Sequence, residues 1–369
     1  MVSEKEKNKN LCQLKGSFAR NGYDWWWHSF TAVSEKNGKE KAFFIEYFII
    51  NPEISPDKVV LGSDGKPCYF MIDCGTWKED KAQLHQYYPM DEVRIDKKNL
   101  HITGPSFLLT EDRIQGHVEV KNPSEIELSD SGFMEWDIKL DKVIGYDVGY
   151  GTSALFRNLH AFDMYWHAKG VKTLMDGYVI YNGERYLVKR DSCYGYSDKN
   201  WGRDFTSPWI WLSSSDLVSE KTGKRLMNSC FEIGGGKPRA FHITFKDRLL
   251  ILFFLEGKRY EFNFSKFWLH SKTEFDCYET EEKIVWNIVA SRPTLRMETH
   301  IECQKKDMLL INYEAPDGER KFHRLFNGGS GVGRIRLFEN GNVVDSFKTG
   351  HVGCEYGRYH KEGDDYRKQ

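Results

Sequence analysis

The hydrophobic residues of this 369-residue chain recur in short runs that are rich in β-branched and aromatic side chains, such as 241–254 and 283–290. Turn signals separate these runs: Asn-Gly occurs at 37–38, 182–183 and 340–341, and Asp-Gly at 64–65 and 317–318. No long segment has a helical period, although residues 79–88 are a candidate for a short helix. The pattern predicts an all-β protein built from antiparallel strands.

A weak internal repeat divides the chain into two halves. Residues 25–29 (Trp-Trp-Trp-His-Ser) precede a turn at 34–39 (Ser-Glu-Lys-Asn-Gly-Lys), and 209–213 (Trp-Ile-Trp-Leu-Ser) precede a similar turn at 219–224. The turn composition is ordinary, so the repeat gains its weight from the β pattern around it. Together they predict two tandem antiparallel barrels, 1–190 and 191–369, with a ligand pocket near their junction.

A dense motif, Tyr-Ser-Asp-Lys-Asn-Trp-Gly, lies at 196–202, close to that junction. On an extended backbone Tyr196, Asp198 and Asn200 share one face, while Ser197, Lys199 and Trp201 share the other. One interpretation is a carboxylic acid positioned by a phenol and an amide in an aromatic pocket. The other is a strand that enters a turn, with the polar side chains capping backbone groups.

Glu46 is a second candidate acid, because it is the one charged residue in the apolar run 42–50. A carboxyl buried there is either paired or held neutral by a raised pKa, since burial disfavours the charged form. A neutral carboxylic acid in an apolar site can protonate an alkene or a carbonyl. A structural Glu46 paired with a buried Arg, Tyr or Trp is the alternative.

Aromatic residues make up 15% of the chain, with eleven tryptophans. Trp25, Trp27 and His28 are candidates for the wall of a cavity, because aromatic faces stabilise cations, including carbocations. Tryptophans also fill β-barrel cores, and histidines are more often structural, so a core role remains open for each.

Charge and cysteine usage narrow the classes of function. The net charge is −1 with no basic cluster, which argues against nucleic acid as a partner, and no apolar run is long enough for a transmembrane helix. The polar start and the eight scattered cysteines predict a cytoplasmic protein with reduced thiols. The chain contains no phosphate loop, dinucleotide fingerprint or metal-ligand spacing, so we expect neither cofactor nor metal.

The 196–202 motif resembles the signature of the tocopherol cyclase and carotenoid 1,2-hydratase group, which are tandem lipocalin-like β-barrel proteins. Trp166-His167 upstream, and the glycine-rich segments 327–333 and 350–357 downstream, resemble the same group. The resemblance implies a lipocalin-like fold in both halves and a cofactor-independent cyclase, hydratase or isomerase that acts on a hydrophobic unsaturated small molecule, such as an isoprenoid or a polycyclic or phenolic compound.

On this resemblance Asp198 is the proton donor or its partner, with Tyr196 orienting it and Glu46 as a second acid. Candidate substrate-binding residues are Trp201, Asn200, Trp25, Trp27, His28, Trp166 and Glu355. A non-catalytic carrier of a hydrophobic ligand is the alternative, because one fold serves many functions.

Overall fold

The computed structural model describes residues 9–62, 64–148, 155–156, 159–240, 243–244, 248–311, 313–318 and 322–359. These residues form β-strands and short 3-10 helices, so the prediction of an all-β chain with two antiparallel, barrel-like sheets is confirmed. The 3-10 helices are η1 (Gly16–Ala19), η2 (Met90–Glu92), η3 (Glu125–Glu127), η5 (Phe267–Leu269) and η6 (Lys305–Asp307).

The first sheet has twelve strands in the order β4-β3-β2-β1-β11-β10-β9-β8-β7-β6-β5, and β12 pairs with both β1 and β10. Its strands are β1 (Tyr23–Ser34), β2 (Glu40–Ile50), β3 (Tyr69–Thr76), β4 (Ala82–Tyr88), β5 (Arg94–Ile95), β6 (His101–Gly104), β7 (Phe107–Thr110), β8 (Arg113–Val120), β9 (Gly132–Ile144), β10 (Met164–Tyr181), β11 (Glu184–Val188) and β12 (Gly195–Gly202).

The second sheet has eleven strands in the order β19-β18-β15-β13-β25-β24-β22-β21-β20, with β14 paired to β25 and β23 paired to β24. Its strands are β13 (Trp209–Ser214), β14 (Asp216–Ser219), β15 (Cys230–Gly236), β18 (Arg248–Leu255), β19 (Lys258–Asn263), β20 (Lys272–Glu279), β21 (Lys283–Ser291), β22 (Leu295–Gln304), β23 (Leu309–Ile311), β24 (Phe322–Glu339) and β25 (Asn342–Tyr359). A separate ribbon joins β16 (Arg239–Ala240) to β17 (Ile243–Thr244).

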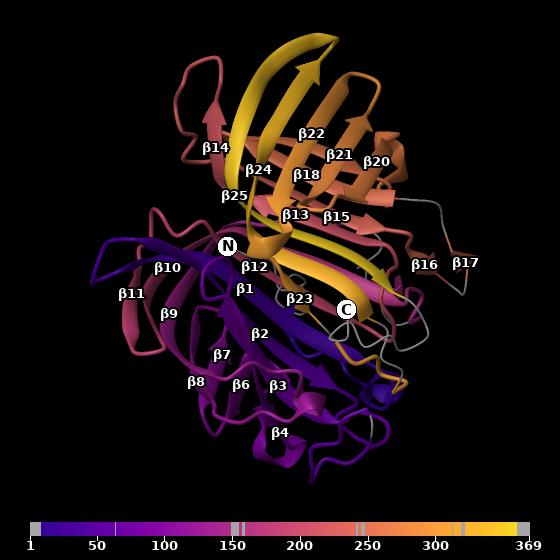
Figure 1. Cartoon of the computed structure of the whole chain (residues 1–369). Coiled ribbons are helices and arrows are strands. Elements are labelled where there is room, and N and C mark those ends of the chain that lie inside the picture. Colours follow the sequence, from indigo (N-terminus) through magenta and orange to yellow (C-terminus); the bar gives the residue numbers. More distant parts are fainter. Residues whose placement is uncertain are drawn as a thin grey trace.

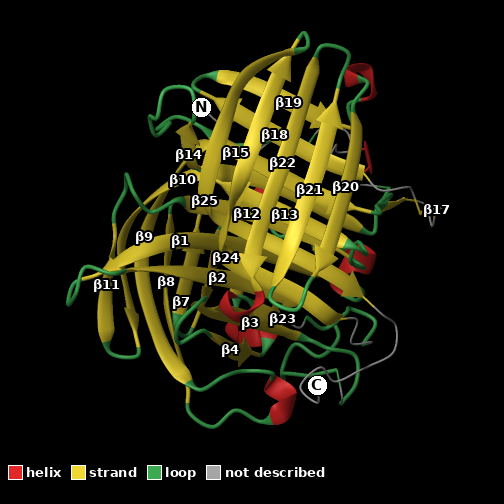
Figure 2. Ribbon diagram, turned by 45° about the horizontal axis from the view of Figure 1, so that its top comes forward, coloured by secondary structure: helices red, strands yellow, loops and turns green. Residues whose placement is uncertain are grey.

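The two sheets lie against each other, the first mainly in indigo to magenta and the second in rose-red through orange to yellow (Figure 1). The chain passes from one to the other between Gly202 and Trp209, so the 196–202 motif forms the last strand of the first sheet. The strands of the second sheet cover the region where β1 and β12 run (Figure 2).

Three hydrophobic cores follow from this arrangement: one inside each sheet and a third between them. Strand β2 shows why its sequence is apolar on both faces. Phe43, Ile45 and Tyr47 point into the core of the first sheet, whereas Phe44 and Phe48 point into the core between the sheets. A strand covered on both sides has no solvent face to which polar residues can be assigned.

Two local expectations have clear outcomes. The candidate helix at 79–88 was wrong, because Ala82–Tyr88 forms β4 and pairs with β3 along its whole length, a tertiary contact that overrides local pattern. The run at 283–290 lies in β21, as predicted. Of the run at 241–254, residues 241–242 and 245–247 lie outside the described residues, and 248–254 lie in β18.

Candidate functional site

A small, partly open cavity lies between the two sheets, and the space around its lining atoms, including the part open to solvent, is about 290 Å³. Four of its lining residues come from the first sheet and four from the second half of the chain: Trp25, Trp27, Asp198 and Asn200, and Trp209, Trp211, Tyr313 and Glu355. Four of the eight lining residues are tryptophans, and the other four supply two carboxyl groups, an amide and a phenol. The cavity therefore combines acids with aromatic faces.

The period-2 alternation of β12 places its polar residues in this cavity. Asp198 and Asn200 line it, and the Tyr196 side chain lies in the core between the sheets. Trp27 is the cross-strand neighbour of Asp198 on one side and of Glu46 on the other. The predicted shared face of Tyr196, Asp198 and Asn200 is confirmed, and the register adds Trp27 and Glu46 to the same row.

Asp198 is the acid whose environment is best defined. Its Oδ2 accepts hydrogen bonds from Trp166 Nε1 at 2.7 Å and from the Tyr196 hydroxyl at 3.0 Å. Its Oδ1 has no hydrogen-bond partner among the described residues. Burial raises the pKa of Asp198 to about 7 although both donors lower it, and the nearby Glu355 raises it further. Near neutral pH a large fraction of this carboxyl is therefore protonated.

Tyr196 connects Asp198 to a carboxyl on the second sheet. Its hydroxyl lies 2.9 Å from Glu232 Oε1, which also accepts from Trp211 Nε1 at 2.8 Å. Glu232 is fully buried, and burial raises its pKa well above the ordinary value. Both sheets therefore contribute a proton-bearing carboxyl to one hydrogen-bonded group.

Glu355 is held in the same manner on the opposite wall. Trp209 Nε1 donates to its Oε2 at 2.6 Å, and Asn327 Nδ2 donates to its Oε1 at 2.7 Å. Trp77 Nε1 in turn donates to Asn327 Oδ1 at 2.9 Å, which fixes the orientation of the amide. Burial raises the pKa of Glu355 to about 7.

Glu46 lies behind the wall of the cavity and reaches it through Tyr313, whose hydroxyl donates to Glu46 Oε2 at 2.8 Å. Burial raises the pKa of Glu46 well above the ordinary value, and the adjacent Asp73 raises it further. Asp73 itself accepts from Gln83 Nε2 at 2.8 Å and lies 3.5 Å from His85 Nε2. Glu46 is thus a buried acid that is separated from the cavity by the side chain of Tyr313.

Stacked rings build the side of the cavity next to Tyr313. The ring of Trp25 stacks on that of Tyr313 with centroids 5.2 Å apart, and on Phe205 at 6.0 Å. Trp27 stacks on Phe44 at 5.1 Å. Several aromatic faces therefore surround the space beside Asp198, as the sequence led us to expect for Trp25 and Trp27.

Trp201 and His28 lie on the other face of their strands and do not line this cavity. Trp201 belongs to the core of the first sheet and stacks on Tyr165 at 5.4 Å. His28 Nδ1 is hydrogen-bonded to Ser197 Oγ at 2.9 Å, and burial lowers its pKa well below the ordinary value. The neighbouring Lys199 points the same way and forms an ion pair with Asp24.

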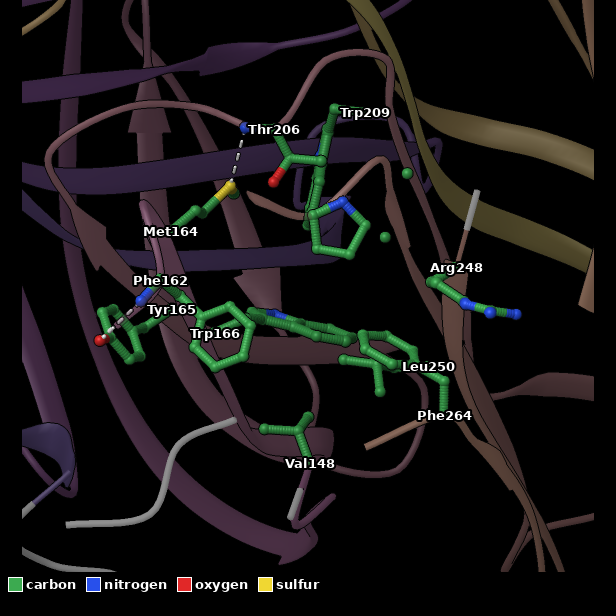
Figure 3. A pocket seen from close by; sticks show the side chains of 13 residues that line it. Val148, Phe162, Met164, Tyr165, Trp166, Thr206, Trp209, Arg248, Leu250 and Phe264 are labelled. Atoms are coloured by element: carbon green, nitrogen blue, oxygen red, sulfur yellow. Dashed lines mark hydrogen bonds between the residues drawn. The ribbon is translucent and has the colours of Figure 1, made fainter. Parts of the chain in front are cut away.

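A second, more apolar pocket adjoins the cavity, and the space around its lining atoms, including the part open to solvent, is about 600 Å³ (Figure 3). Val148, Phe162, Met164, Leu250 and Phe264 supply much of its apolar lining. It shares Trp209 with the acid cavity, and the ring of Trp166, whose Nε1 binds Asp198, also lines it. These two indoles cross edge to face, with centroids 6.4 Å apart. An apolar pocket thus lies on one side of the two indoles and the acids on the other.

Two glycines of the second sheet make room for the indoles that orient the acids. A Cβ at Gly234 would lie 2.8 Å from Trp166 Cη2, and one at Gly353 would lie 2.4 Å from Trp211 Cη2. Real Cβ atoms are essentially never found that close to a ring carbon, so larger residues would displace these rings. Gly353 lies in the C-terminal glycine-rich segment noted in the sequence.

Sequence reasoning missed several residues of the site. Glu232 is the one carboxylate in the buried run 230–234, which is the signal that identified Glu46. Trp209 and Trp211 were noticed only as part of the repeat. Asn327 was noticed only as the first residue of the glycine-rich segment 327–333. Tyr313 had no local signal, because it meets the site through contacts with Glu46 and Trp25 of the first sheet.

Within the described ranges, no group of three or more His, Cys, Asp or Glu side chains is arranged to hold a metal ion. Across the same ranges, no helix has the length and apolar character needed to cross a bilayer.

Comparisons with known proteins place these features in context. The model of a family described as tocopherol cyclase-like matches residues 76–337. A rice protein (Oryza sativa subsp. japonica) described as a probable chloroplastic tocopherol cyclase is 29% identical over 101 residues, which cover 27% of this chain and 20% of that protein. The matched segment is thus one fifth of the length of that relative. A solved structure from Nitrosomonas europaea, described as an AttH, superposes with a TM-score of 0.44 and 10% identity over 91% of each chain.

Proposed function

The chain belongs to the tocopherol cyclase-like family, and from that premise we propose that it is an acid–base enzyme that cyclises, hydrates or isomerises a hydrophobic unsaturated small molecule. One observation carries the proposal: a buried carboxyl, with a pKa of about 7, lines an indole-walled cavity with one oxygen held by two donors and the other without a partner among the described residues. Carboxylic acids kept partly neutral at physiological pH are the groups that enzymes use to donate protons.

The chemical step uses the two oxygens of Asp198 differently. The π electrons of a substrate double bond take the proton from Oδ1, so that a C–H bond forms and the O–H bond breaks. The negative charge that develops is stabilised by the N–H of Trp166 and the O–H of Tyr196 on Oδ2. Proton donation by a positioned acid contributes ~10²–10⁴-fold to the rate.

The cation produced at carbon lies among aromatic faces. Trp25, Trp27, Trp209 and Trp211 line the cavity, and an indole face stabilises a cation by ~2 kcal/mol or more when water is excluded. An oxygen of the substrate that attacks the cation closes a ring, water that attacks it gives hydration, and loss of a neighbouring proton gives isomerisation. The family favours cyclisation among these three outcomes.

Two further features support binding of a largely apolar substrate that carries a polar group. The pocket of Figure 3 offers apolar side chains next to Trp166 and Trp209. Trp27 Nε1, on the wall of the cavity, is buried and has no hydrogen-bond partner within the described residues. A hydroxyl of the substrate would satisfy such a group, since buried polar atoms left unpaired are costly.

The experiment that tests this proposal follows the proton. The protein is incubated in D₂O with a panel of unsaturated isoprenoids and prenylated phenols, and products are analysed by mass spectrometry and NMR. We expect a product with one deuterium on carbon, formed by the wild type and not by Asp198→Asn. Tight binding of a panel member without deuterium incorporation would instead identify a carrier.

A further inference from the structure

The Tyr196 hydroxyl lies between two carboxyl groups that come from different sheets. It is 3.0 Å from Asp198 Oδ2 on its own strand β12 and 2.9 Å from Glu232 Oε1 on β15. Resting on the proposed function of Asp198, we propose that Glu232 is a proton reservoir that reprotonates Asp198 through the Tyr196 hydroxyl after each turnover.

The single hydrogen of the Tyr196 hydroxyl favours proton transfer from Glu232 to Asp198 through this group. A phenol donates one hydrogen bond, so Tyr196 can donate to only one of its two carboxyl neighbours at a time. When Asp198 is ionised, Tyr196 donates to Asp198 and accepts from a protonated Glu232. Trp211 Nε1, 2.8 Å from Glu232 Oε1 and 3.2 Å from the Tyr196 oxygen, keeps the two groups aligned.

The transfer balances in atoms and charge. The Tyr196 O–H bond breaks as its proton joins Asp198 Oδ2, and the Tyr196 oxygen takes the proton of Glu232 Oε1. Half a turn of the Asp198 carboxyl about its Cβ–Cγ bond then brings the protonated oxygen to the open position that Oδ1 held. Asp198 and Tyr196 end neutral, and Glu232 ends as a carboxylate. Glu232 then takes a proton from solvent, while the proton that the substrate cation loses is released to solvent.

Glu232 is suited to store a proton and unsuited to meet a substrate. It is fully buried and does not line the cavity, so it acts only through Tyr196. Burial raises its pKa well above the ordinary value, and the charge of Asp198 raises it further, so Glu232 still holds a proton when Asp198 has lost one. The transfer to Asp198 is therefore uphill, and it is completed when the Glu232 carboxylate takes a proton from solvent. Burial also raises the pKa of the Tyr196 phenol, so Tyr196 passes protons without being a stable phenolate.

A phenol outside the relay, that of Tyr146, senses the charge of Glu232. Burial raises the pKa of Tyr146 well above the ordinary value, and the nearby Glu261 and Glu232 both raise it further. Glu261 is partly exposed and pairs with Lys266 at 2.7 Å. Tyr146 therefore lies within the electrostatic reach of both the reservoir and a carboxylate that meets solvent.

Other charged or titratable groups also act on the two carboxyls, from several elements. Those whose charge reaches Asp198 or Glu232, or is affected by them, are Glu46 on β2, Tyr146 after β9, Lys199 on β12, Cys230 on β15 and Glu355 on β25. In the described part of the chain, the hydrogen bonds of the Tyr196 hydroxyl go to Asp198, Glu232 and Trp211 and to none of these five groups. Their charges shift equilibria, whereas the relay controls a rate, so a rate measurement separates the two.

The experiment is a rapid pH jump on the substrate-free protein, from pH 9 to pH 6, followed by infrared absorption. The signal is the C=O stretch of protonated Asp198, identified by its absence in Asp198→Asn. We expect reprotonation to be at least tenfold slower in Glu232→Gln and in Tyr196→Phe, with no further slowing in the double variant, because both changes interrupt one path.

Glu314→Gln is the matched control, since Glu314 is a buried carboxyl that accepts from the Gly62 backbone N–H at 2.6 Å, does not line the cavity and, among the described residues, is not one of the hydrogen-bond partners of Tyr196. We expect its reprotonation rate to stay within twofold of wild type. Equal rates in wild type, Glu232→Gln and Tyr196→Phe, with unchanged melting temperatures, would overturn the relay. If Glu232→Gln fails to fold, Tyr196→Phe alone decides the question.

This measurement needs no substrate, so its outcome is independent of the deuterium test. If reprotonation of Asp198 is slow in Glu232→Gln but the wild type deuterates no panel member, the relay is supported and the proposed function is refuted. If Glu232→Gln reprotonates Asp198 at the wild-type rate and the wild type does deuterate a panel member, only the relay is refuted.

Discussion

Replacing Asp198 by Asn should change how the stability of the fold depends on pH. The amide has the shape of the neutral carboxylic acid, and its oxygen can still accept from Trp166 and Tyr196. The substitution removes one property, the ability to ionise. A protonated Asp198 and the amide of the Asp198→Asn variant should therefore stabilise the fold to a similar extent, whereas an ionised Asp198 should not.

The magnitude follows from the pKa. Asp198 titrates from an ordinary value of 3.8 in the unfolded chain to about 7 in the folded protein, because burial disfavours the carboxylate. A raised pKa gives stability that is fully present below the unfolded value and is lost as pH rises through the folded value. At about 1.4 kcal/mol for each pH unit, the wild type loses about 4 kcal/mol between pH 4 and pH 8 through this group.

The assay is chemical denaturation of wild type and Asp198→Asn at pH 4 and pH 8, with the free energy of unfolding extrapolated to water. The difference between variant and wild type should be about 4 kcal/mol more favourable to the variant at pH 8 than at pH 4. Asp276→Asn, at an exposed position of β20, is the matched control and should stay within about 0.5 kcal/mol of wild type at both pH values.

An equal difference between Asp198→Asn and wild type at the two pH values would refute the reasoning, because it would mean that the buried carboxyl does not hold a proton near neutral pH.

Three further predictions concern activity on a substrate found with the deuterium assay. The kcat should be constant below pH 7 and fall about tenfold per pH unit above it as Asp198 ionises. This alkaline limb of the pH profile should persist in Glu355→Gln, and its disappearance in that variant would mean that the limb reports the ionisation of Glu355. Gly234→Ala should push the Trp166 ring from its position, weaken its bond to Asp198 and so move the limb to higher pH; an unmoved limb would show that the ring is not displaced. Glu46→Gln should lower kcat less than tenfold, because Glu46 reaches the cavity only through Tyr313, and a loss as large as that of Asp198→Asn would make Glu46 the acid.

The period of the strands made part of the site predictable. Alternation alone placed Asp198 and Asn200 on one face of β12 and Lys199 on the other, and the structure has this arrangement. Glu46 was identified because a single carboxylate stands in an apolar strand, and the same reasoning applies to Glu232. The pattern within one strand was therefore sufficient to predict which of its side chains share a face and which carboxylate is buried.

Local rules could not predict which face of a strand that is buried on both sides packs against the second sheet. Trp25 and Trp27 face the second sheet, whereas His28 faces the core of the first sheet, and all three belong to a strand buried on both sides. Trp201 likewise belongs to a strand buried on both sides, and its side chain lies in the core of the first sheet and not in the cavity. Tyr313 enters the site through its hydrogen bond to Glu46 and its stacking on Trp25, both far away in the sequence, and no pattern in its own segment indicates these contacts.

The most direct test of the account is the turnover number of Asp198→Asn, measured in D₂O on the substrate that the wild type deuterates, alongside its melting curve. The account predicts a folded variant whose kcat is lower by about 10²-fold or more with KM little changed, because the lost proton is needed only in the transition state. A folded Asp198→Asn with the turnover and carbon deuteration of the wild type would contradict it.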